Sequence, residues 1–168
     1  MTSSHDDFVR ARLALWHRRI EDTARLMTTP PDESATTGLL PVLYQLTAMH
    51  NLTSGLVSDL RQAAISALAA TAPGRQYLSQ LADALVHSSR ATTHLSRAVT
   101  GLTTFPSRAT PSDSGEAVQK RLDARLGHTA ALRSLKRAAQ AVLVSTPAAE
   151  HGRAPDTMHQ RPARRPRH

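Results

Sequence analysis

The stretch LLPVLYQLTAMHNLTSGLVSDLRQAAISALAA, residues 39–70, decides the fold because Asp59 and Arg61 are its only formally charged side chains. Its apolar residues recur every three or four positions, with Thr53 filling the one gap, and this spacing is that of one face of an α-helix. We therefore expect a buried helix that other helices cover. Its apolar positions are Leu39, Val42, Leu43, Leu46, Met49, Leu56, Leu60, Ala63 and Ala67.

Three further segments have helical patterns. The first opens with Ser4 followed three residues later by Asp7, which resembles a capping pair, and it ends before Pro30 and Pro31. A short Ala72-Pro73-Gly74 link joins the second helix to the third, which requires the two to pack antiparallel. The predicted helices span about residues 4–27, 39–71, 74–102 and 113–145.

The third and fourth helices differ in how regular their apolar faces are. The third has apolar or small residues at Leu78, Leu81, Leu85, Ser88, Thr92, Leu95, Val99 and Leu102. In the fourth, the first half has Val118, Leu122 and Leu126 stepping by four, with Arg121 and Arg125 close to the same face. Gly127 lies where this pattern meets that of the second half, so a kink and a split both stay open there.

These segments predict an all-α protein with one domain, residues 1–146, folded as an antiparallel up-down-up-down four-helix bundle. A period near 3.5 residues favours shallow, coiled-coil-like crossing angles. Residues 147–168 are rich in arginine and proline and poor in apolar residues, which predicts a disordered basic tail.

The composition excludes several kinds of chemistry. Without cysteine the chain has no disulfide, no thiolate nucleophile and no cysteine-ligated metal. It has no phosphate-binding or dinucleotide-binding motif, so we expect no cofactor and no small-molecule ligand. Asp83, His87 and His94 follow one strip of the third helix, but that strip lies off the apolar face. We expect these three residues to face solvent and to bind no metal.

One alternative is a helical ribonuclease of the HEPN type, in which a catalytic arginine is followed after four to six residues by a histidine. Arg12 and His17 have this spacing, and so do Arg121 and His128. A chain so rich in arginine and histidine yields such pairs by chance, and we infer no membership of that family. We expect no catalytic residue.

The formal net charge of +8 resides mainly in the fourth helix and the tail. Such charge attracts nucleic-acid phosphates in a salt-dependent manner without reading sequence. Aromatic residues make up only 3% of the chain, so it has no base-stacking platform. We expect the helix cations to be spread around the helix rather than gathered on one strip. The candidate contacts are Lys120, Arg121, Arg125, Arg133, Lys136, Arg137, Arg161, Arg164, Arg165 and Arg167.

The leading functional hypothesis is a non-enzymatic interaction or small regulatory module. Phe8, Leu15 and Leu26 lie beside the apolar face of the first helix, which suggests a homodimer or another protein partner. Weak, nonspecific nucleic-acid binding is the alternative. We expect no membrane span, and a cytoplasmic location, because no cationic start leads into an apolar run.

Overall fold

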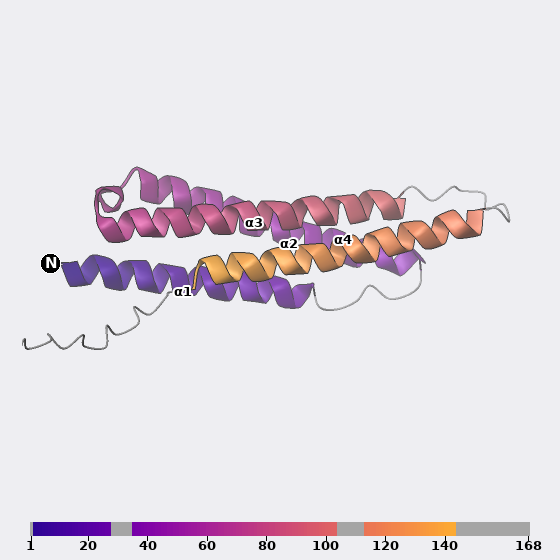
Figure 1. Ribbon diagram of the computed structural model, residues 1–168, viewed down its shortest axis with the longest axis horizontal. Coiled ribbons are helices and arrows are strands. Elements are labelled where there is room, and N and C mark those ends of the chain that lie inside the picture. The colour runs from indigo at the N-terminus through magenta and orange to yellow at the C-terminus, as the bar shows by residue number, and fades with distance from the viewer. Residues whose placement is uncertain (1, 28–34, 104–112, 144–168) are drawn as a thin grey trace, which may run out of the picture.

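The computed structural model describes residues 2–27, 35–103 and 113–143. Four long helices and a short 3₁₀-helix make up this part of the chain, and it contains no strand, so the predicted all-α fold is confirmed (Figure 1). The expected tail, residues 147–168, lies outside the described residues. The elements are α1 (Thr2–Leu26), α2 (Ala35–Ala64), η1 (Ala67–Ala70), α3 (Ala72–Thr103) and α4 (Asp113–Ala141).

Consecutive helices run in opposite directions, and α1 and α4 are offset along the bundle (Figure 1). α1 reaches the end where η1 lies, α4 reaches the opposite end, and the two overlap only near the middle. The most extensive packing is that of α3 against α4 and against α2. The organising helix is therefore α3, and not the stretch 39–70 from which the sequence argument began.

The apolar face predicted for α2 is largely buried, at Val42, Met49, Leu56 and Ala63. The expectation that the whole low-charge stretch is buried is nevertheless wrong. Several large apolar side chains of this stretch face outward, because the neighbouring helices cover only one side of α2. These exposed residues are Leu40, Leu43, Tyr44, Val57 and Ile65.

The turn between α2 and α3 differs from the predicted one, since α2 ends at Ala64 and η1 follows. The hydroxyl of Ser66 donates to the carbonyl of Ala63 at 2.8 Å, which satisfies a carbonyl at the helix end. The hydroxyl of Thr71 accepts the backbone N–H of Gly74 at 3.0 Å and so caps α3. A Cβ at Gly74 would lie 1.8 Å from the carbonyl oxygen of Leu68, so this turn requires glycine.

Other helix boundaries also differ from those expected. α1 already begins at Thr2, so Ser4 lies within the helix, and Asp7 pairs with Arg10 at 3.2 Å. α2 begins at Ala35, which places Pro41 beyond the first turn. Because proline has no N–H, α2 lacks one backbone hydrogen bond there.

Small residues determine how α3 and α4 meet. The buried face of α3 is rotated from the predicted leucine series toward Tyr77, Ala84, Ala91 and Ala98. α4 is continuous through Gly127, which neither splits nor ends it. A Cβ at Gly127 would lie 3.0 Å from the carbonyl oxygen of His94, so glycine allows α4 to approach α3 closely at this point.

Candidate functional site

The outward face of α4 carries most of the predicted cations that the structure describes. α4 buries Ala131, Leu135 and Ala138 against the bundle, and Val142, directly after its end, is buried as well. At 3.6 residues per turn, four cations of α4 fall within an arc of about 120° on the side of the helix opposite these buried residues. They are Arg125, Arg133, Lys136 and Arg137, and all four are exposed. Lys120 does not share this side, so the cations of this helix are not all gathered on one strip, as expected, but these four share its outward half.

The remaining candidate contacts are placed differently or fall outside the described residues. Lys120 is half-buried, on the side of α4 that faces Gly101 of α3. Arg121 lies within α4, but its side chain is outside the described part. The tail residues Arg161, Arg164, Arg165 and Arg167 also lie outside it.

The first half of α4 exposes apolar side chains. Val118, Leu122 and Leu126 are four residues apart and about half or more exposed, whereas Ala124 and Gly127 face the bundle. From the sequence alone, the side of this half of the helix that faces the bundle could not be decided. The small side chain at Ala124 and the absence of one at Gly127 allow the close approach to α3, and this turns the larger residues outward.

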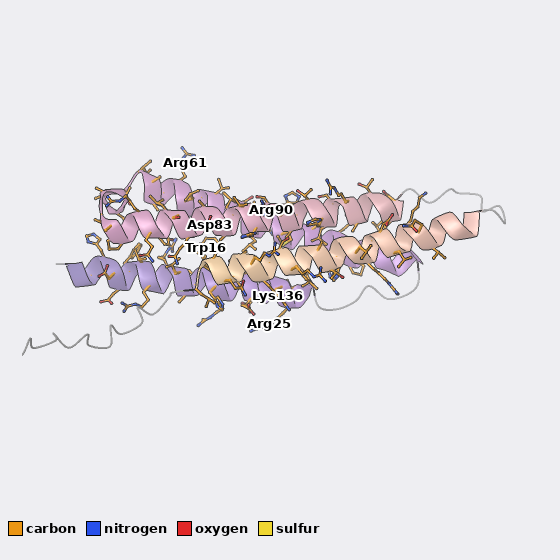
Figure 2. The ribbon with its side chains drawn as sticks, viewed as in Figure 1. Trp16, Arg25, Arg61, Asp83, Arg90 and Lys136 are labelled. Carbon is orange, nitrogen blue, oxygen red and sulfur yellow. The ribbon has the colours of Figure 1, made fainter. Side chains whose placement is uncertain are left out.

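A groove of about 470 Å³ lies between α1 and the end of α4. Its walls are His17, Arg18, Glu21 and Arg25 of α1. Ala14, Val142 and Leu143 supply the apolar part of its lining. The guanidinium of Arg25 pairs with Asp22 at 2.9 Å. Lys136 and Arg25 lie at the same edge of the molecule (Figure 2).

An apolar patch, defined by Leu26, Leu40, Leu43 and Tyr44, lies where the end of α1 meets the start of α2. The side-chain amide of Gln45 donates to the carbonyl of Leu26 at 3.1 Å and holds the two helices together there. Leu26 is 60% exposed, Leu40 57% and Tyr44 70%. This is an unusual exposure for large apolar side chains on adjacent helices.

The carboxylate of Asp59 is buried between three helices, an arrangement that we call the Asp59 cluster. Trp16 of α1 donates its indole N–H at 2.5 Å, and Tyr77 of α3 donates its hydroxyl at 2.6 Å. Arg12 of α1 donates to the other carboxylate oxygen. Trp16 also packs over Gly55, where a Cβ would lie 3.0 Å from the ring.

The hydrogen bonds of the Asp59 cluster shift two pKa values. Burial raises the pKa of Asp59, but hydrogen bonds from Tyr77, Trp16 and Arg12 outweigh it and hold that pKa below its ordinary 3.8. Burial, followed by the hydrogen bond to Asp59, raises the pKa of Tyr77 to about 12. Asp59 therefore stabilises the fold above pH about 4, and this contribution is lost as the pH falls through its lowered pKa.

Sequence patterns do not reveal this cluster, although Asp59 is one of only two charges in an apolar stretch. A lone acid on a buried helix face signals a buried partner. Nothing in the spacing, however, connects it with Arg12 or Tyr77, because those contacts join three different helices.

The structure does not bring Arg12 and His17 together, and the side chain of Arg121, the predicted partner of His128, lies outside the described part. Arg12 binds Asp59 while His17 lines the groove with α4, so they lie on opposite flanks of α1. Burial lowers the pKa of His128. His87 and His94 are half-buried rather than solvent-facing, because α4 packs along this flank of α3. Within residues 2–27, 35–103 and 113–143, no group of three acidic or histidine side chains is placed to hold a metal.

Neither the known protein families, nor the curated proteins, nor the solved structures provide a match to this chain. None of the described helices combines the length and apolarity that a membrane crossing requires.

Replacing Asp59 by asparagine should destabilise the protein by about 1.5–3 kcal/mol, because hydrogen bonds to a charged acceptor become bonds to a neutral one and Arg12 loses its ion pair. Urea denaturation followed by the fluorescence of Trp16, the single tryptophan, measures this. The matched control is Asp83→Asn, an exposed acid on α3 that should change stability by less than about 0.5 kcal/mol (Figure 2). Equal stability of the two variants would contradict a structural role for the cluster.

The ionisation of Tyr77 should be visible directly in a Tyr44→Phe chain, where Tyr77 is the only tyrosine. Its raised pKa means that the neutral form stabilises the fold below pH about 10, and that this contribution is lost as the pH rises toward 12. Tyrosinate absorbance and helical circular dichroism are recorded together against pH. Ionisation near pH 10 with the helices intact would show that Tyr77 is not held in the cluster.

Proposed function

We propose that this protein is an interaction module without an active site of its own, and that it self-associates as a homodimer. The observation that carries this proposal is the apolar patch of Leu26, Leu40, Leu43 and Tyr44. Contiguous exposed apolar surface costs free energy in water, at about 25 cal/mol per Å², and commonly marks a protein interface.

The same flank of α1 extends the patch along the bundle. Phe8 and Leu15 are 53% and 39% exposed, and helical spacing places both on the side of Leu26. A face built from one helix and the start of its neighbour suits an isologous dimer, in which the same surface of both copies is covered. The aromatic ring of Tyr44 is the kind of side chain that contributes most to such interfaces.

Sedimentation velocity should show a monomer–dimer equilibrium for the full chain, shifting toward dimer as concentration rises. Leu26→Glu combined with Tyr44→Glu should give monomer throughout, since two carboxylates would be buried against their own copies in a symmetric interface. The control is Val57→Glu with Val86→Glu, both 48% exposed on α2 and α3, which should still dimerise. If the full chain stays monomeric at high concentration, the protein does not self-associate. If the Leu26→Glu, Tyr44→Glu variant still forms dimers, the apolar patch is not the interface.

A second candidate function is nonspecific association with nucleic acid. It is favoured by the common outward face of Arg125, Arg133, Lys136 and Arg137, because clustered cations release counterions from phosphates. The arginines of the tail would add to this attraction. Binding would carry no base preference, since the chain offers no recognition motif.

Deleting residues 148–168 should weaken the binding of duplex DNA and flatten its salt dependence. Each lost phosphate contact should reduce the slope of log affinity against log salt by about 0.9. Fluorescence anisotropy of labelled duplex, titrated with the full and shortened chains at several salt concentrations, gives both slopes. Identical slopes would show that the tail takes no part.

A further inference from the structure

The outward side of α4 carries exposed apolar side chains in its first half and exposed cations in its second. Val118, Leu122 and Leu126 are 54%, 48% and 65% exposed. α1 overlaps α4 only near the middle of the bundle, so it does not cover this first half (Figure 1). At 3.6 residues per turn, three of the cations fall within the same arc of about 100° as these apolar residues. We call this surface the outer strip of α4, and its members are Val118, Leu122, Leu126, Arg133, Lys136 and Arg137.

The charge of the outer strip is positive. Between residues 124 and 143 the sequence has four cations and no acid. Two acids stand near it: Asp123, which accepts a hydrogen bond from Gln119 at 3.2 Å, and Glu21, which is half-buried in the groove beside the end of α4. Neither forms an ion pair with Arg133, Lys136 or Arg137 in the part of the chain that the structure describes.

We propose that the outer strip of α4 binds the surface of an anionic lipid bilayer. The apolar side chains enter the boundary between headgroups and acyl chains, while the cations attract the lipid phosphates. Such a helix lies on the bilayer and does not cross it. The proposed homodimer uses a patch on α1 and α2, so this inference does not depend on it.

The combination of apolar and cationic side chains favours a bilayer over two other partners. Duplex phosphates would contact Arg133 and Arg137 but leave Leu122 and Leu126 in water. A second copy paired in parallel along the whole strip would bring Arg133 against its own copy. Paired antiparallel, it would bury Arg133 against leucines. Both arrangements bury cations without an acidic partner, which costs free energy.

The spacing of the apolar residues disfavours a partner helix. A helix packed in a coiled coil requires apolar residues that alternate by three and four positions. Val118, Leu122 and Leu126 instead step by four twice, so each step turns by about 40° around the helix axis. A partner helix would lose contact with such a row. A bilayer is broad and fluid, and it contacts the full arc without a fixed register.

The first test is co-sedimentation of the full chain with vesicles at low salt. One set of vesicles contains phosphatidylcholine alone, and the other contains equal amounts of phosphatidylcholine and phosphatidylglycerol. We expect binding to the mixed vesicles only, and weaker binding as salt rises, because three apolar side chains bury too little surface without attraction between charges. Failure to bind the mixed vesicles, or equal binding to both sets, overturns the inference. If the chain binds duplex DNA but not the mixed vesicles, nucleic-acid association stands and the bilayer inference fails.

A pair of double variants then tests the apolar half of the strip. Leu122→Gln with Leu126→Gln should lower the affinity for mixed vesicles by at least about tenfold, because both side chains lose their burial. The control is Val57→Gln with Val86→Gln, both 48% exposed on α2 and α3, and it should bind like the unchanged chain. Circular dichroism verifies that all variants keep the helical fold. If the Leu122→Gln, Leu126→Gln variant binds like its control, these side chains do not enter the bilayer and the inference fails.

A second pair tests the cations at equal loss of charge. Arg133→Gln with Arg137→Gln should weaken binding about fivefold for each cation removed. Arg61→Gln with Arg90→Gln removes exposed cations of α2 and α3 and should weaken it less. Arg61 lies at the opposite edge of the molecule from Lys136 (Figure 2). Equal losses would show that the charge of the whole chain, including the tail, holds the vesicles, and would overturn the role of α4.

Discussion

The carboxylate of Asp59 joins three of the four helices through hydrogen bonds from Arg12, Trp16 and Tyr77. A buried carboxylate is tolerated only when its lone pairs are satisfied, so each donor must sit at a defined height along its own helix. The cluster thus sets the register of α1 and α3 against α2. Sliding α1 by one turn would remove Arg12 and Trp16 from the carboxylate and leave it with the hydroxyl of Tyr77.

Close packing between α3 and α4 is the second constraint, and it determines which surface of α4 faces outward. Gly127 and Ala98 bring the two backbones together, and large side chains would not fit between them. Val118, Leu122 and Leu126 consequently face away from the bundle. Arg133 and Lys136, on the side opposite the buried residues, are exposed as well.

The two flanks of α1 differ in character. Its flank toward α2 carries the exposed apolar residues Phe8, Leu15 and Leu26, and its flank toward α4 carries Arg18 and Arg25.

The sequence by itself determined that the chain is helical, where its helices lie to within a few residues, and that Val42, Met49 and Leu56 are buried. These follow from apolar spacing, which is a property of one helix at a time. It also pointed to Phe8, Leu15 and Leu26 as more apolar surface than one bundle needs. Only the tertiary structure decided that Asp59 meets Arg12 and Tyr77, that α4 turns Leu122 and Leu126 outward, and that Arg18 lines a groove with the end of α4. Those outcomes depend on how each helix is rotated about its axis and shifted along its neighbours. Small residues such as Gly127 and Gly55 determine this, because they allow close contacts with segments far apart in the chain.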